Sequence, residues 1–214
     1  MEEKGIKIKQ GEIENSRFTD KTGYLQRKSD IMWAVETILA AIGENPEREG
    51  LLGTPERVAR MYLSELSIGT EVEYGEVLSA TFNEEHDEMV VIKDIQYYSL
   101  CEHHMVPYFG KAHVAYIPDG EVVGLSKIAR LVEKVTSTLS IQENVTSIIA
   151  DTIMEELAPK GVMVIINGEH LCMAMRGIKK PGANTTTSAV RGVFKDNSEG
   201  EVSPRQEFLD LLKL

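Results

Sequence analysis

Both cysteines of this 214-residue chain and three of its five histidines lie in two short segments that could bind a metal together. The segments are Cys101-Glu102-His103-His104 and His170-Leu171-Cys172. Thiolate and imidazole groups are preferred ligands of zinc, which binds them in tetrahedral geometry. Because His104 follows Cys101 at a spacing of one helical turn, a turn or tight loop places both on one side. With Cys172 they predict a three-ligand site whose fourth position is open to water, as in catalytic zinc centres.

Three other interpretations of these residues remain open. A fourth ligand, His103 or His170, would close the site and make it structural. The cysteines could be buried apolar side chains without a metal. They could also form a disulfide, but no apolar segment typical of a signal peptide follows Met1, so we expect a cytoplasmic protein whose thiols stay reduced.

The length and composition are typical of a globular protein with one domain, or one domain and an extension. The formal net charge of −11 argues against a nucleic-acid partner, because duplex binding requires a basic face. Apolar runs such as 162–166 are too short to cross a bilayer, so we expect no membrane partner. A small anionic ligand is still compatible, since it responds to local charge.

The sequence pattern predicts a flexible arm over residues 1–28, a helical region over 29–70 and a catalytic domain over 71–214. Apolar residues at helical spacing predict helices, and alternating Val, Ile and Tyr predict strands. The helices are expected at 29–42, 54–69, 126–138, 140–157 and 203–212, and the strands at 89–98, 109–117, 162–167 and 170–178. The order strand–strand–helix–helix–strand–strand indicates an α+β fold with an antiparallel sheet that helices cover on one face.

Several basic residues are candidates for binding an anion. Ser126, Lys127 and Arg130 lie in the first turn of a predicted helix, with Ser126 as its cap, where the helix dipole disfavours cations unless an anion binds there. The alternative is an exposed basic pair on a helix. Arg176 follows Cys172 at even spacing on a predicted strand, so both would point into one pocket, unless Arg176 pairs with surface carboxylates.

Gln142-Glu143 is a candidate site for a purine base. A carboxylate can accept two parallel hydrogen bonds from a ring N–H and an exocyclic amine, which guanine presents on one edge. The competing explanation is structural, because Ser140-Ile141-Gln142-Glu143 has the form of a capping box, in which Glu143 bonds the start of its own helix.

The chain resembles the GTP cyclohydrolase I family from about Ser29 to Leu212. The segments that carry the resemblance are Gly53–Ala59, Ser99–His104, Gly124–Arg130, Gln142-Glu143, Glu169–Met173, Met175–Gly177, Thr185–Ser188 and Gly192–Phe194. The resemblance implies a T-fold (tunnelling fold), in which antiparallel sheets of neighbouring subunits join into barrels. It also implies a homodecamer of two pentamers, with active sites at subunit interfaces.

The activity implied is that of a hydrolase acting on the C–N bonds of a purine ring. GTP and water would give 7,8-dihydroneopterin triphosphate and formate, the first step of tetrahydrofolate or other pterin biosynthesis. Carried over by position, Cys101, His104 and Cys172 would hold Zn²⁺, and the water it activates would attack C8 of guanine. His103 and His170 would transfer protons, as histidine can near neutral pH.

The resemblance also assigns the substrate contacts. Glu143, with Gln142, would anchor the guanine edge. The triphosphate would be held by Ser126, Lys127, Arg130 and Arg176, with Arg57 supplied by a neighbouring subunit.

The chain departs from the family at positions that usually hold arginines, where it has Ser137, Thr138 and Asn144. Each charge-assisted contact contributes roughly 1.5–3 kcal/mol, so these changes would weaken GTP binding or alter assembly. One alternative function is therefore a catalytically weak GTP- or pterin-binding protein of the same fold. Another is a different purine- or pterin-handling T-fold enzyme that shares only the carboxylate anchor.

Overall fold

The computed structural model describes residues 21–196 and 203–213, in two compact units that divide between Met61 and Tyr62. The first unit holds helices α1 (Lys21–Ala41) and α2 (Thr54–Met61). An ion pair of 2.7 Å between Lys28 Nζ and Glu56 Oε1 links the two helices.

Both helices differ in length from the prediction. Helix α1 begins at Lys21, before the predicted start at Ser29, so it includes residues assigned to the arm. The rest of the predicted arm lies outside the described residues. Helix α2 ends at Met61, and the predicted continuation to residue 69 instead forms a short π-helix η1 (Tyr62–Leu66) and the start of a 3₁₀-helix η2 (Ile68–Glu71).

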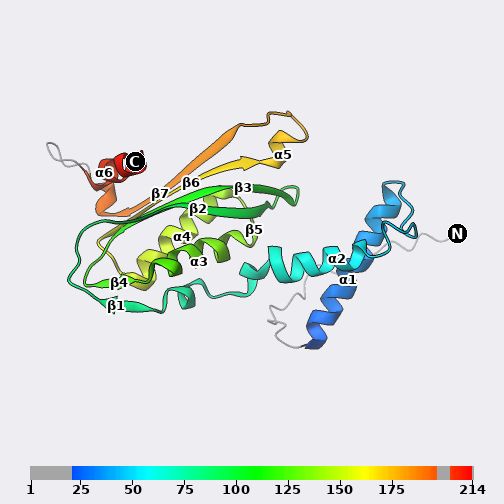
Figure 1. Cartoon of the computed structure of the whole chain (residues 1–214), viewed down its shortest axis with the longest axis horizontal. Helices are drawn as coiled ribbons and strands as arrows, with labels where there is room; N and C mark the ends of the chain where they lie inside the picture. Colours follow the sequence, from blue (N-terminus) through cyan, green and yellow to red (C-terminus); the bar gives the residue numbers. More distant parts are fainter. Residues whose placement is uncertain (1–20, 197–202, 214) are drawn as a thin grey trace, which may run out of the picture. The chain divides into compact units, whose positions relative to one another are not determined.

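The second unit is built around a five-stranded sheet in the order β5-β2-β3-β6-β7 (Figure 1). Its long strands pair antiparallel, whereas the short β5 pairs parallel with β2. The strands are β2 (Val90–Cys101), β3 (Val106–Ile117), β5 (Leu139–Ser140), β6 (Gly161–His170) and β7 (Asn184–Gly192). A separate antiparallel pair joins β1 (Thr81–Asn83) and β4 (Glu121–Val123).

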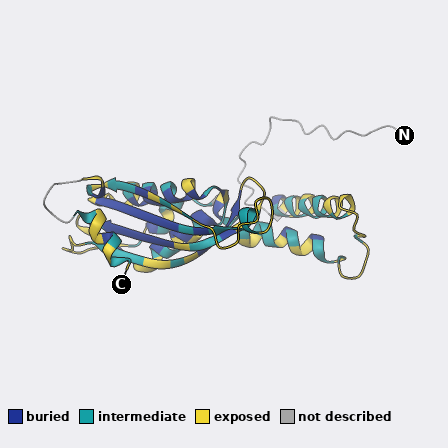
Figure 2. Ribbon diagram, turned by 90° about the horizontal axis from the view of Figure 1, so that it is seen from above, coloured by how far each residue is buried: buried dark blue, intermediate teal, exposed yellow. Residues whose placement is uncertain are grey.

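Helices α3 (Leu125–Thr136) and α4 (Gln142–Leu157) cover one face of the sheet. The main core lies between them and the sheet, and Figure 2 shows the buried strands in dark blue. A smaller core lies on the opposite face, where Phe194 and Phe208 pack on Met163 and Ile165. The remaining elements are 3₁₀-helices η3 (Tyr74–Leu78) and η4 (Val193–Lys195), and helices α5 (Leu171–Ala174) and α6 (Pro204–Leu211).

The predicted α+β fold and the order strand–strand–helix–helix–strand–strand are confirmed. Helices α3 and α4 lie close to their expected bounds. The prediction of a strand over 170–178 is wrong, because β6 extends to His170 and the chain then forms the single turn α5. Leu, Met and Ala favour helix, and periodicity alone cannot assign a short apolar run. The last long strand is β7, whose Thr185 carbonyl and Thr187 hydroxyl accept hydrogen bonds from Gln142 of α4.

A bulge in β2 determines which face of the sheet carries Cys101. The register with β3 shifts between Ile92 and Ile95, around Asp94, whose φ is 60°. Ile92 before the bulge, and Ile95 and Cys101 after it, all contact the main core. In a regular strand only every second residue faces the core. The extra residue of the bulge shifts this alternation by one, so even-numbered Ile92 and odd-numbered Ile95 and Cys101 all face the core. The backbone N–H of Asp94 donates to His113 Nδ1 at 3.2 Å, which stabilises the bulge.

Candidate metal centre and active site

Side chains from two distant segments of the sequence meet where β2 and β6 end. Cys101 is the last residue of β2, His170 is the last of β6, and Cys172 lies in α5. Strand β3 pairs with both β2 and β6. Val106 lies opposite Cys101 and Tyr108 lies opposite His170, so β2 and β6 end at the same end of the sheet. The ligand atoms of Cys101, His170 and Cys172 lie within 4.8 Å of one another, which makes a possible Cys-His-Cys metal site.

The chemistry of this cluster fits a soft divalent metal. Both cysteines are free, so the disulfide interpretation is wrong for this structure. Burial, and then the neighbouring Cys101 thiol, raise the pKa of Cys172. A thiol that resists ionisation, as Cys172 does, is stabilised as a thiolate when a cation binds beside it. Two sulfurs and one imidazole nitrogen are also the donor types that zinc prefers.

The predicted ligand His104 lies on the turn after Cys101, outside the Cys101–His170–Cys172 group that the described chain brings together. Its backbone N–H donates to the Cys101 carbonyl oxygen at 3.3 Å. Its Nε2 lies 2.8 Å from Nη1 of Arg176, and because a guanidinium can only donate, Nε2 is unprotonated and accepts this bond through its lone pair. His103 Nδ1 is 3.7 Å from the Cys101 sulfur. The structure therefore brings Arg176 to the site as predicted, but from the segment after α5 rather than from a strand.

His170 is held from two sides. Its ring stacks parallel on Tyr108, with centroids 4.6 Å apart and planes 1° apart, and its Nε2 is 3.0 Å from Gln142 Oε1. Burial lowers the pKa of His170, and the Glu143 carboxylate opposes that shift. Burial also raises the pKa of Tyr108 to about 12, so its phenol stays neutral. Tyr108 was missed from the sequence, where its only signal is its place in an alternating strand.

The capping-box explanation of Glu143 is wrong. The N-cap of α4 is Ile141, and no side chain bonds the start of the helix, because Ser140 belongs to β5. Glu143 is exposed in the first turn and available to a ligand, whereas Gln142 beside it is fully buried.

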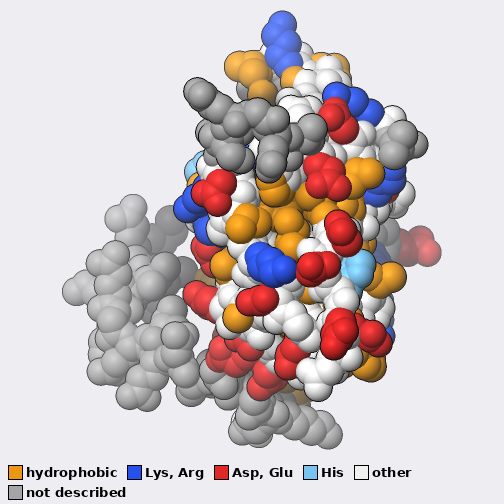
Figure 3. Space-filling model, turned by 90° about the vertical axis from the view of Figure 1, so that its left-hand side faces the viewer, with side chains coloured by type: hydrophobic (Ala, Val, Ile, Leu, Met, Phe, Trp, Pro, Cys, Tyr) orange, Lys and Arg blue, Asp and Glu red, His pale blue; other side chains and the backbone are white. Residues whose placement is uncertain are grey.

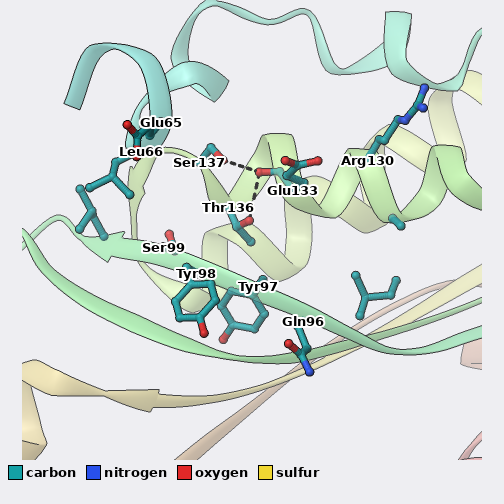
Figure 4. A pocket seen from close by; sticks show the side chains of 13 residues that line it. Glu65, Leu66, Gln96, Tyr97, Tyr98, Ser99, Arg130, Glu133, Thr136 and Ser137 are labelled. Carbon is teal, nitrogen blue, oxygen red and sulfur yellow. Dashed lines mark hydrogen bonds between the residues drawn. The ribbon is translucent and has the colours of Figure 1, made fainter. Parts of the chain in front are cut away.

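The three anion-binding candidates on α3 are not part of this cluster in the described chain. The N-cap of α3 is Gly124, so the predicted cap at Ser126 is wrong. Arg130 lines a cavity of about 440 Å³ between η1, β2 and α3, together with Tyr98 and Glu133 (Figure 4). On the face shown in Figure 3, acidic side chains surround an apolar area, in keeping with the net charge of −11.

Comparison with known proteins identifies the family. A family model described as GTP cyclohydrolase I matches residues 31–213. A protein named GTP cyclohydrolase 1 from Pelotomaculum thermopropionicum is 58% identical over 181 residues, 84% of this chain and 94% of that protein. The protein of that name from Bacillus subtilis is 54% identical over 187 residues, 87% and 96% of the two chains. The chain belongs to the GTP cyclohydrolase I family.

Membership of the GTP cyclohydrolase I family confirms the T-fold and the hydrolase class expected from the motifs. A solved apo structure of an archaeosine synthase QueF-Like protein has a TM-score of 0.40 and 17% identity, covering 49% of this chain and 93% of its own. A likeness at that level adds nothing to the assignment. Among the described helices, none combines the length and apolar character needed to cross a bilayer.

Ser137 and Thr138, two of the three positions where the resemblance led us to expect arginines, make local hydrogen bonds here. Ser137 Oγ donates to the Glu133 carbonyl at 2.7 Å, and Thr138 Oγ1 donates to the Val135 carbonyl at 2.8 Å. These hydroxyls satisfy carbonyls at the end of α3, while Asn144 is exposed on α4. Arg57 lies in the first unit, where its Nη2 donates to Thr54 Oγ1 at 3.0 Å.

Proposed function

We propose that this protein converts GTP and water to 7,8-dihydroneopterin triphosphate and formate, the first step of tetrahydrofolate or other pterin biosynthesis. The observation that carries the proposal is the Cys101–His170–Cys172 cluster beside the exposed Glu143, in a member of this family. Relatives at 50–58% identity that are named GTP cyclohydrolase 1 support it. The two free thiols also support a cytoplasmic location, where cysteines stay reduced.

We assign zinc to Cys101, Cys172 and His104. His170 is also close, but Gln142 and Tyr108 hold its ring on two sides. His104 is exposed and its Nε2 lone pair faces only a guanidinium, a weak surface contact that a cation can replace. When bound, zinc supplies Lewis-acid activation of water.

The chain's own residues orient the base and move protons. Glu143 accepts hydrogen bonds from the ring N–H and the exocyclic amine of guanine. His170 accepts a proton readily only if it is neutral, and burial favours that neutral form by lowering its pKa. The nearby Glu143 carboxylate stabilises the imidazolium that results. His103 is exposed and 3.7 Å from the Cys101 sulfur, so it can exchange protons between the site and solvent.

The triphosphate is held by cations, most of them from another copy of the chain. Arg176 lies at the cluster, whereas Ser126, Lys127 and Arg130 lie on α3 and belong to a different part of the same chain. A neighbouring copy supplies these three residues and Arg57, in a homodecamer of two pentamers. The edge of β7 supports such an assembly, because no other strand of the described residues pairs with it on that side.

The decisive experiment incubates purified protein with zinc and GTP and measures formate. The proposal predicts formate together with a pterin that fluoresces after oxidation. GTP binding without formate would instead support the catalytically weak binding protein. Release of formate with no pterin product would contradict the rearrangement step.

A further inference from the structure

The side chain of Gln142 is fully buried and bonded at both ends to groups of the protein itself. Its Nε2 lies 3.0 Å from the Ile166 carbonyl, 3.0 Å from the Thr185 carbonyl and 3.1 Å from Thr187 Oγ1. Its Oε1 lies 3.0 Å from His170 Nε2. Both N–H groups of the buried amide are therefore engaged within the chain, and it has none left to donate to a guanine base.

The surrounding groups also fix which end of the amide is nitrogen. Carbonyl oxygens only accept, so those of Ile166 and Thr185 require the N–H end. Thr146 Oγ1 donates its one hydrogen to the backbone carbonyl of Gln142 at 2.7 Å. In the 2.6 Å contact between the Thr146 and Thr187 hydroxyls, Thr187 is therefore the donor. Thr187 Oγ1 is then left to accept from the Gln142 amide. All three neighbours agree on one orientation.

This orientation determines the tautomer of His170. Because Gln142 Oε1 can only accept, the hydrogen of the neutral imidazole lies on Nε2, and Nδ1 keeps its lone pair. The parallel stack on Tyr108 fixes the plane of the ring. Gly168 makes room for the acceptor, since a Cβ there would lie 2.5 Å from Gln142 Oε1.

We propose that Gln142 is a positioning residue that fixes the tautomer and ring orientation of His170, and that it does not contact the guanine. The proposal rests on the proposed function, in which His170 accepts a proton. A histidine locked in one tautomer presents the same basic nitrogen in every turnover, with no ring flip to precede proton transfer. Loss of Gln142 should therefore reduce turnover rather than substrate binding.

The kinetic test compares Gln142→Met, Gln142→Glu and Glu143→Gln. We expect Gln142→Met to lower kcat by about 10- to 100-fold, with KM and Kd for GTP changed by less than about threefold. Gln142→Glu keeps an acceptor oxygen toward His170 and should retain more of kcat. Glu143→Gln should mainly raise KM. A raised KM with unchanged kcat in Gln142→Met, or equal losses of kcat in both Gln142 variants, would overturn the proposal.

A spectroscopic test is independent of turnover. In ¹⁵N-histidine-labelled protein assigned with a His170→Asn variant, long-range ¹H–¹⁵N spectra should show His170 protonated on Nε2 and not on Nδ1. Gln142→Met should show a mixture, and if that variant does not fold, Gly168→Ala should show it by displacing Oε1. A wild-type His170 protonated on Nδ1 would contradict the positioning role. If the tautomer is as expected but GTP releases no formate, the proposed function fails and the positioning role stands.

Discussion

The cysteine cluster and the start of α3 are both assigned to one site, but they differ in how completely one chain organises them. At the cluster, Gln142 and Tyr108 hold His170 in defined contacts. On α3, the side chains of Lys127 and Arg130 make no hydrogen bond or ion pair with other residues that the structure describes.

This difference indicates that the cluster carries out proton transfer, whereas the start of α3 binds the substrate. Residues that move protons need fixed geometry, and a fold supplies it through internal hydrogen bonds. Cations that bind a phosphate chain need accessible positive charge, and a partner inside the chain would neutralise it. We therefore expect variants of the two regions to affect different kinetic constants.

The largest effect is expected from the two histidines at the cluster. His170→Asn should lower kcat by about 10²- to 10⁴-fold, because it removes a general acid–base group, while zinc content is unchanged. His104→Asn should lose zinc together with activity. The measurements are formate release and metal content in the same preparations.

The matched control is His86→Asn, since His86 is exposed in a loop before β2 and has no assigned role. It should behave as wild type. If His170→Asn loses zinc and His104→Asn keeps it, the imidazole ligand is His170 and the assignment of His104 is wrong.

Variants of α3 should affect binding more than turnover. Lys127→Ala and Arg130→Ala should each raise KM for GTP by about 10-fold or more, since each removes a charge-assisted contact to phosphate. The effect should diminish at high salt as the remaining charges are screened. Lys134→Ala, at the other end of the same helix, is the control and should leave KM unchanged.

Mixed assemblies test whether the two regions come from different copies. Cys172→Ser and the double variant Lys127→Ala/Arg130→Ala should each be inactive or weak alone. When they are co-expressed in equal amounts, about a quarter of the sites should combine intact halves and recover activity. If the co-expressed protein is no more active than the average of the two separate variants, both halves of the site come from one chain.

A smaller effect is expected at the β2 bulge. Burial lowers the pKa of His113 from its ordinary value of 6.5, so just below that value the unfolded chain binds more protons than the folded one. The free energy of unfolding should therefore fall as pH is lowered from about 7 to about 5. His113→Gln should cost about 1 kcal/mol near pH 7 and reduce this pH dependence, as measured by urea unfolding. An unchanged pH dependence would contradict the role of His113.

Much of the fold follows from local patterns in the sequence. Apolar stripes at helical spacing predicted α3 and α4, and alternation predicted β2, β3 and β6, because each element buries one face in the main core. The α5 turn and β7 were not predicted. Leu171–Ala174 is too short for its period to be read, and β7 alternates threonines with other small or polar residues rather than strongly apolar ones.

The site shows the same limit. Residue types and spacing predicted that Cys101 and Cys172 meet beside a histidine, but the histidine that the structure groups with the two sulfurs is His170 rather than the predicted ligand His104. The sequence could not show that Gln142 is turned inward, since this depends on carbonyls of β6 and β7 far along the chain. Tyr108 was missed for a similar reason, because its stack on His170 arises only when β3 pairs with β6.

The most direct measurement is zinc content and formate release in wild type, Cys101→Ser and Cys172→Ser purified in parallel. A shared thiolate site predicts about one zinc per chain in the wild type, with zinc and formate both lost in each variant. Either variant that keeps a full complement of zinc and normal turnover would show that these two sulfurs do not hold a catalytic metal.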